Sequence, residues 1–239
     1  MSSYKKILFT GASGRFGSKF RSYFNSKNYI YPKRKDLNIT IFKSIERYLD
    51  KYRPKILVHC AALSRPMDIH ESNISKSILT NIIGTCNLVV ACEKRDIKLI
   101  YFSTNYVYPG VKGNYSEKSN LLPINNYGWS KLGGECAVHM YKNSLILRIC
   151  MTEKPFIHKK AFKNVKTNFI FHEEVVKILP KLFKYKGIIN VGGPIQSIFQ
   201  FAKKSNFSVK GVNLKKSKRK DIKLNPSMNI RKLNKILND

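Results

Sequence analysis

Short apolar runs alternate with longer amphipathic stretches over most of the first two thirds of the chain. The apolar runs predict buried strands at 5–10, 29–32, 55–61, 98–103 and 144–149. Apolar side chains that recur every three or four positions predict helices at 15–26, 40–52, 74–93 and 127–141. This order of elements predicts an α/β fold, in which a doubly wound parallel sheet carries helices on both faces.

The pattern is less regular after Cys150. Residues 151–168 are basic and predict no regular element, whereas the later residues predict helices at 173–184, 198–205 and 229–237 and a strand at 187–191. In a doubly wound fold, ligands bind at the carboxyl ends of the strands. We therefore expect residues 1–150 to form the main domain and residues 151–239 to form a small lobe near that edge, partly interleaved with the sheet.

The chain has a formal net charge of +31, which is compatible with two interpretations. One is a nucleic-acid partner. The other is a basic composition without such a partner, and we favour it because the lysines are spread along the sequence and accompany no nucleic-acid-binding motif. We see no apolar run that approaches the ~20 residues of a membrane-spanning helix, so we expect no membrane association.

The cysteines and histidines suggest neither disulfides nor a metal site. The five cysteines are scattered without a CxxC pair, and the five histidines lack metal-ligand spacing. Scattered thiols on apolar segments are typical of a reducing compartment. We therefore expect a cytoplasmic protein that binds no metal.

A glycine-rich loop, TGASGRFG, joins the first predicted strand to the first predicted helix. Gly11 would permit the tight turn, Gly14 would let backbone N–H groups approach a pyrophosphate, and Gly17 would let the helix pack on the strand. The helix N-terminus favours an anion, because its first N–H groups are unpaired and its dipole is positive there. The predicted dinucleotide contacts at this loop are Gly11, Ser13, Gly14, Arg15, Phe16 and Gly17.

The residues after the second predicted strand bear on the choice of cofactor. NAD-binding folds often place an acid there, which binds the ribose hydroxyls. This chain has Pro32-Lys33-Arg34-Lys35 before its first acid, Asp36. Cations suit a 2′-phosphate, so Arg34 favours NADPH, with NADH as the other possibility. The competing interpretation is that these cations belong to the general basic surface.

The stretch YGWSK places Tyr127 and Lys131 on one face of a predicted helix, one loop after Ser103 and Thr104 end the fourth predicted strand. This set suits hydride transfer to a ketone, which leaves an alkoxide that needs a proton. Tyr127 could supply that proton, because a nearby ammonium lowers a tyrosine pKa from its usual ~10. Lys131 could also bind the nicotinamide ribose, and Thr104 could hold the carbonyl oxygen.

Several motifs resemble the extended short-chain dehydrogenases/reductases, which have a Rossmann fold. These motifs are TGASGRFG, Cys60-Ala61-Ala62, Asn81, Ser103-Thr104 and the Tyr127/Lys131 pair. Further stretches resemble the dTDP-4-dehydrorhamnose reductase family, namely DLNIT, FSTNYVYPG, LLPINNYGWSKLGGE, LILR and the segment from Pro226-Ser227 to Lys232-Leu233. The resemblance is dense over residues 5–150 and thin beyond them.

The resemblance implies an NAD(P)H-dependent oxidoreductase that reduces the 4-keto group of a nucleotide-linked 4-dehydro-6-deoxy sugar, of the dTDP- or UDP-4-dehydro-L-rhamnose type. Residues 1–150 would bind NAD(P), residues 151–239 would bind the nucleotide sugar, and the chain would act as a monomer or homodimer. The implied residues are catalytic Thr104, Tyr127 and Lys131, cofactor-lining Ala61, Ala62, Leu63 and Lys131, and substrate-contacting Ser103, Asn105 and Tyr106.

The two positions after Thr104 limit the implied chemistry. Sugar 4,6-dehydratases carry an acid pair there, and bifunctional epimerase-reductases carry a cysteine at the second position. This chain has Asn105 and Tyr106, which implies reduction without elimination or epimerisation. Two alternatives remain open: a same-fold nucleotide-sugar epimerase that keeps its cofactor bound, and a non-catalytic NAD(P)-binding regulatory subunit.

Overall fold

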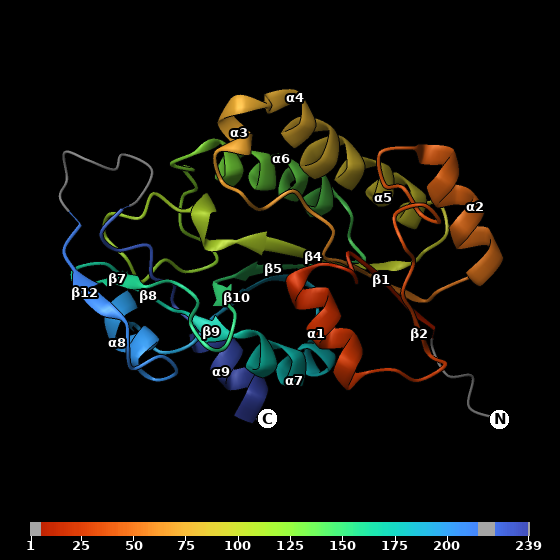
Figure 1. The fold of residues 1–239 in the computed structure, drawn as a ribbon. Coiled ribbons are helices and arrows are strands. Elements are labelled where there is room, and N and C mark those ends of the chain that lie inside the picture. The colour runs from red at the N-terminus through yellow and green to blue at the C-terminus, as the bar shows by residue number, and fades with distance from the viewer. Residues whose placement is uncertain (1–5, 215–222, 239) are drawn as a thin grey trace. The chain divides into compact units, whose positions relative to one another are not determined.

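The computed structural model describes residues 6–214 and 223–238 and contains a six-stranded sheet of order β10-β5-β4-β3-β1-β2 (Figure 1). The strands are β1 (Ile7–Thr10), β2 (Tyr29–Ile30), β3 (Ile56–His59), β4 (Lys98–Thr104), β5 (Ser144–Ile149) and β10 (Gly187–Val191). Strands β2, β1, β3 and β4 pair in parallel, with Ile7 opposite both Tyr29 and Ile56. The predicted α/β fold with a parallel sheet is confirmed.

The described residues form two compact units. The first unit comprises the chain up to Ser103 together with Ser130–Leu147 and Phe183–Gly187, and the second comprises Thr104–Trp129, Arg148–Leu182 and the chain from Ile188 onward. Helix α6 (Asn126–Met140) contributes residues to both units. The expected assignment of residues 1–150 to the cofactor and 151–239 to the substrate stays a prediction.

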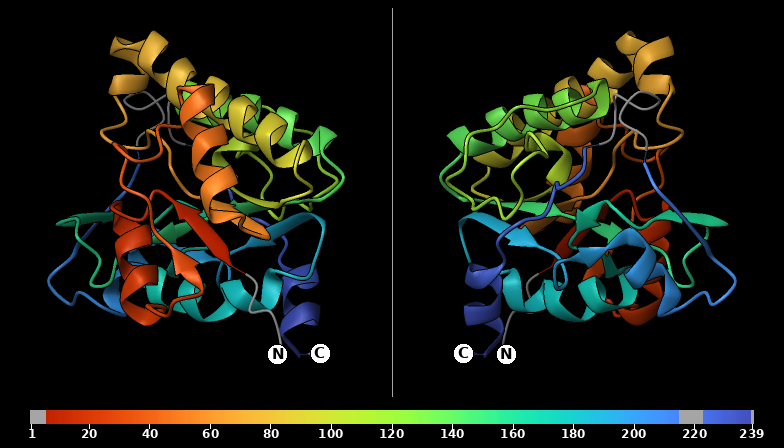
Figure 2. Two further views of the ribbon diagram at one scale, coloured as in Figure 1. Left: turned by 90° about the vertical axis from the view of Figure 1, so that its right-hand side faces the viewer. Right: turned by 90° about the vertical axis from the view of Figure 1, so that its left-hand side faces the viewer.

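Helices cover both faces of the sheet in the first unit. Helix α1 (Arg15–Tyr23) lies on one face, and α2 (Phe42–Tyr52) and α5 (Gly84–Glu93) lie on the other (Figure 2). All four residues of β1 and of β3 are buried, as expected for a parallel strand with both faces covered. On the α1 side, the rings of Phe9 and Phe20 stack with their centroids 4.8 Å apart. The apolar side chains that recur along α1 thus pack on apolar side chains of β1.

The long helix predicted over 74–93 contains a change of helical type. It consists of α4 (Ile74–Ser77), a π-helical turn (Ile78–Ile83) and α5. By length and composition this stretch could cross a membrane, contrary to the expectation that no apolar run approaches that length. The core helix of a soluble protein has the same length and composition, so these two properties alone do not make this stretch a membrane span. The π-helical turn buries the polar side chain of Asn81.

Short elements build much of the second unit. Helices α7 (His172–Leu182) and α9 (Arg231–Asn238) pack on each other. The strand pairs are β6 (Met151–Thr152) with β9 (Ile170–Phe171), β7 (Lys160–Phe162) with β12 (Lys210–Val212), and β8 (Lys166–Thr167) with β11 (Gln196–Ser197). Residues 151–168, predicted to be irregular, therefore contain strands of two or three residues, which are too short to show a period in the sequence.

Two shorter helices complete the described elements. Helix α8 (Ile198–Lys203) begins with a capping box, in which Ser197 and Gln200 exchange side-chain-to-backbone hydrogen bonds. Helix α3 (Ile69–Ser72), which the sequence pattern did not predict, spans a single turn. A single turn shows no helical period, and this explains why the apolar pattern missed α3.

Candidate functional site

The glycine loop has the backbone geometry that its sequence predicts. Gly11 adopts φ +79°, and a Cβ atom there would lie 2.6 Å from the backbone nitrogen of Ala61. A Cβ atom at Gly17 would lie 2.2 Å from the carbonyl oxygen of Gly11. Gly14 precedes α1 as its N-cap, where no side chain caps the helix. The loop thus packs its backbone tightly and leaves the first turn of α1 suited to an anionic group.

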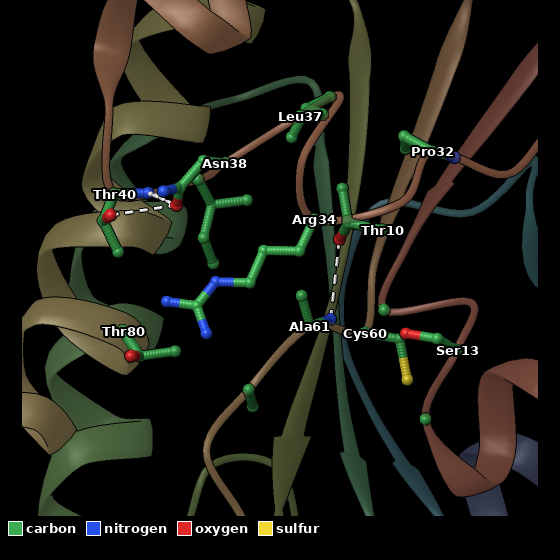
Figure 3. Close-up of a pocket in the computed structure, with 14 residues that line it drawn as sticks. Thr10, Ser13, Pro32, Arg34, Leu37, Asn38, Thr40, Cys60, Ala61 and Thr80 are labelled. Carbon is green, nitrogen blue, oxygen red and sulfur yellow. Dashed lines mark hydrogen bonds between the residues drawn. The ribbon is translucent and has the colours of Figure 1, made fainter.

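A cavity of about 240 Å³ lies beside this loop, entirely within the first unit (Figure 3). Six of the predicted cofactor residues line it, namely Gly11, Ser13, Gly14, Arg34, Ala61 and Ala62. The other lining residues were not predicted as cofactor contacts, and they are Thr10, Pro32, Leu37, Asn38, Ile39, Thr40, Cys60 and Thr80. The stretch DLNIT, which ends at Thr40, contained a signal for four of these residues.

Arg34 supplies a positive charge to this cavity. Its guanidinium extends between Thr40 and Thr80 (Figure 3). The nearby acid, Asp36, instead accepts a hydrogen bond from the backbone N–H of Lys33 at 3.2 Å and is not among the lining residues. This arrangement suits a phosphate group better than a ribose diol at this end of the cavity.

Three further predicted cofactor residues, Arg15, Phe16 and Leu63, lie within two positions of a cavity-lining residue in the sequence. The Arg15 guanidinium donates a hydrogen bond to Ser64 Oγ at 3.3 Å. The Phe16 side chain is buried next to Phe102, and their ring centroids are 5.2 Å apart. Phe16 could therefore contact a cofactor only through its backbone. The backbone N–H and carbonyl of Leu63 are both held by Asn81, each at 2.8 Å.

Lys131 is buried in the first unit and is 3% exposed. Burial lowers the pKa of its ammonium to about 7, although Cys60 and Glu135 act in the opposite direction. Burial also raises the pKa of the Cys60 thiol to about 12. The Glu135 carboxylate accepts a hydrogen bond of 2.5 Å from Ser103 Oγ. The hydroxyl proton of Ser103 is therefore used within the protein. Ser103, which was predicted to contact the substrate, can still accept a hydrogen bond through its oxygen.

The second unit holds the other predicted catalytic and substrate residues. Thr104 Oγ1 accepts a hydrogen bond from the Tyr106 backbone N–H at 3.3 Å, which caps the 3₁₀ turn Asn105–Val107. The rings of Tyr106 and Tyr127 meet edge to face, with centroids 5.7 Å apart. A Cβ atom at Gly128 would lie 2.6 Å from the Tyr106 carbonyl oxygen, so the glycine of YGWSK permits this close approach.

Tyr127 and Lys131 share one helix, and the Asn105 side chain is held by a hydrogen bond. Tyr127 and Lys131 both lie on α6, four residues apart. Asn105 is buried and donates a hydrogen bond to the Pro226 carbonyl at 3.4 Å. Across residues 6–214 and 223–238, no three His, Cys, Asp or Glu side chains gather as metal ligands would.

The sequence and the structure resemble known proteins. The family model described as the RmlD substrate binding domain matches residues 5–169. A dTDP-4-keto-6-deoxy-D-glucose reductase of Streptomyces niveus is 36% identical over 134 residues, which are 55% of this chain and 46% of that protein. The methionine adenosyltransferase 2 subunit beta of Xenopus tropicalis is 31% identical over 155 residues, which are 61% of this chain and 46% of that protein. The chain thus spans less than half the length of both relatives.

A solved structure resembles the whole chain. The dTDP-4-dehydrorhamnose reductase of Bacillus anthracis, crystallised in complex with NADP, has a TM-score of 0.85. The match covers 100% of this chain and 93% of that one, at 24% sequence identity. At this identity the similarity demonstrates the shared fold.

Proposed function

Because the chain belongs to the RmlD substrate binding domain family, we propose that it is an NAD(P)H-dependent reductase of a nucleotide-linked 4-dehydro-6-deoxy sugar. The observation that carries the proposal is the buried ammonium of Lys131, one helical turn after Tyr127 on α6. Burying a lysine destabilises a fold, so its presence is better explained by chemistry than by packing. The sugar is of the dTDP- or UDP-4-dehydro-L-rhamnose type.

The first unit fits a nicotinamide dinucleotide. The tight glycine loop and the uncapped start of α1 suit its diphosphate, and Arg34 suits a 2′-phosphate. We therefore propose NADPH as the preferred cofactor, with NADH as the weaker one. When bound, the reduced nicotinamide supplies the hydride, and the protein supplies position and the proton.

The proposed roles follow from the chemistry of ketone reduction. Hydride addition to the sugar C4 leaves an alkoxide, and Tyr127 donates its phenolic proton to that oxygen. The Lys131 ammonium favours the phenolate that Tyr127 becomes, and it would hydrogen-bond the nicotinamide ribose of a bound cofactor. Thr104 holds the carbonyl oxygen, and Ser103, Asn105 and Tyr106 contact the sugar. With no carboxylate at positions 105 and 106, the chain reduces without eliminating water.

We further propose that the enzyme is cytoplasmic and acts as a monomer or homodimer. All five cysteines are free thiols in the described chain, in keeping with a reducing compartment. Size-exclusion chromatography coupled to light scattering would establish the oligomeric state.

The test is reduction of a dTDP- or UDP-4-dehydro-6-deoxy-L-hexose by the purified chain, followed as loss of NADPH absorbance. The expected result is one NADPH consumed for each ketone reduced, and a loss of about 100-fold or more in kcat for Tyr127→Phe. Tyr23→Phe, at a half-exposed tyrosine of α1, is the matched control and should retain the rate. Unchanged turnover in Tyr127→Phe would exclude Tyr127 as the acid. Product formation without NADPH loss would favour an epimerase.

A second candidate is a non-catalytic NAD(P)-binding subunit. The similarity to a protein named as a subunit of methionine adenosyltransferase favours it. It predicts NADPH binding without turnover of any of these sugars, and equal NADPH binding by the wild type and Tyr127→Phe. The intact set of Thr104, Tyr127 and Lys131 argues for the reductase, since a binding subunit need not keep all three.

A further inference from the structure

A buried histidine outside the proposed catalytic residues connects two parts of the first unit. His59 is 1% exposed and ends β3, one residue before the cavity lining at Cys60. Its Nδ1 lies 2.9 Å from Thr10 Oγ1, and its Nε2 lies 3.0 Å from Thr85 Oγ1. Both ring nitrogens therefore have hydroxyl partners on different elements, β1 and α5.

The partners of Thr85 determine which nitrogen carries the proton. Thr85 Oγ1 donates its proton to the carbonyl oxygen of Asn81 at 2.8 Å. It must therefore accept from His59, which places the imidazole proton on Nε2. Nδ1 is then an acceptor, and Thr10 Oγ1 donates to it. All donors in this chain of hydrogen bonds point from β1 towards the π-helical turn.

The imidazole is held in its neutral form. Burial keeps the pKa of His59 well below its usual value, and the charge of Lys131 acts in the same direction. The ring also lies against Tyr101, with centroids 5.6 Å apart. A neutral ring with one donor and one acceptor is what the two threonine partners require.

Each end of this series of hydrogen bonds adjoins a part of the proposed site. Thr10 lines the cavity and immediately precedes Gly11. At the other end, the Asn81 side chain holds the Leu63 backbone, and its amide donates to Ser130 Oγ at 2.9 Å, next to Lys131. The glycine loop, the segment at Leu63 and helix α6 are thus linked by one set of buried and half-buried hydrogen bonds.

We propose that His59 is a positioning residue, which couples the glycine loop to the Asn81 turn and thereby sets the affinity of the cavity for the dinucleotide. It acts through Thr10 and Thr85. The inference rests on the proposed function, because cofactor affinity is one of its readouts.

The first test is independent of any cofactor. Nitrogen NMR of histidine-labelled full-length protein should show His59 as the Nε2–H tautomer at neutral pH, with Nδ1 unprotonated. His70, the other buried histidine of the first unit, serves as an internal comparison. A His59 signal from the Nδ1–H tautomer, or from an average of both tautomers, would overturn the proposed series of hydrogen bonds through His59.

The second test is a double-mutant cycle. Thr10→Val and Thr85→Val each remove one hydroxyl partner, and NADPH Kd is measured for both single variants, the double variant and the wild type. Coupling through His59 predicts that the second substitution has a much smaller effect on Kd once the first is present. Effects that multiply to within about twofold would show that the two hydroxyls act independently and would refute the proposal.

Variants of the histidine itself complete the design. His59→Leu should raise the NADPH Kd by about tenfold, from the loss of two buried hydrogen bonds. His59→Gln, which keeps one donor and one acceptor, should recover part of that loss. His70→Leu should leave the NADPH Kd unchanged. An equal rise in Kd for both leucine variants would indicate a general loss of packing in the first unit and would contradict a specific role of His59. If wild-type protein binds no NADPH, the proposed function fails, and the NMR result still decides the tautomer.

Discussion

The Lys131 ammonium lies 4.1 Å from the centroid of the Tyr101 ring, while the Tyr101 hydroxyl donates to the Lys131 carbonyl oxygen at 2.9 Å. The same tyrosine therefore contacts both the backbone and the charge of this lysine. A ring face stabilises a buried cation by about 2 kcal/mol. This stabilisation is partial, because burial still lowers the pKa of Lys131 to about 7.

The lowered pKa predicts how stability depends on pH. Above about pH 7 the folded protein releases the Lys131 proton, whereas an unfolded lysine keeps its proton up to ~10.4. The unfolded state then binds one more proton, so the free energy of unfolding should rise with pH by up to about 1.4 kcal/mol per unit. The useful window is about pH 7 to 8.5, because above it the buried thiols, such as Cys60, act in the opposite direction.

Urea unfolding across this window measures the effect. Lys131→Met should remove the rise with pH, and it should stabilise the protein most at the low end of the window, where the wild type buries an ammonium. Lys142→Met, at an exposed lysine just after α6, is the control and should keep the wild-type slope. Equal slopes in Lys131→Met and the wild type would contradict the buried, titrating ammonium.

Arg34 should determine the choice between the two cofactors. Arg34→Ala removes the guanidinium from the cavity, so it should weaken NADPH binding by about 10- to 100-fold and leave NADH binding nearly unchanged. Fluorescence titration with each cofactor measures the dissociation constants for NADPH and NADH. Lys35→Ala removes an equal charge from an exposed neighbour that is not among the lining residues, and it should affect the two cofactors alike. An equal loss for NADPH and NADH in Arg34→Ala would show that its charge acts non-specifically.

The sequence predicted the long elements well, for identifiable reasons. Every long strand and helix of the described residues was found, because a strand buried on both faces leaves a continuous apolar run and a helix buried on one face leaves a period of three to four residues. The strand Lys160–Phe162 was missed because three residues show no period. The network around His59 was also missed, because its partners are 26 and 49 residues away and meet only through the sheet. The cavity wall at Thr80 likewise depends on folding rather than on local pattern.

Two glycines of the loop should respond differently to alanine. At Gly17 a Cβ atom would lie 2.2 Å from the backbone oxygen of Gly11, so Gly17→Ala should cost about 3 kcal/mol of stability. At Gly14 the nearest atom, the backbone oxygen of Gly11, would be 3.2 Å away, so Gly14→Ala should cost less stability than Gly17→Ala. A methyl group there would instead obstruct the approach of a diphosphate, and NADPH affinity should fall. Thermal unfolding and cofactor titration together separate the two effects, and a stable Gly17→Ala protein would contradict the packing described.

Asn81 should contribute more to stability than a second asparagine on the same helical stretch. Its side chain makes three hydrogen bonds, two to the Leu63 backbone and one to Ser130, and it is 1% exposed. Asn87, half-buried on α5, donates one hydrogen bond to the Ile39 carbonyl. Asn81→Leu would leave the half-buried backbone N–H and carbonyl of Leu63 without these partners, which predicts a loss of about 3 kcal/mol, against about 1 kcal/mol for Asn87→Leu.

Chemical denaturation of both leucine variants makes the comparison, and cofactor titration adds a second readout. Because Leu63 and Ser130 adjoin the proposed site, Asn81→Leu should also weaken NADPH binding in the protein that remains folded. Asn87→Leu is compared for stability only, because its partner Ile39 also lines the cavity. Equal losses of stability in the two variants would mean that the Leu63 segment does not depend on the Asn81 side chain.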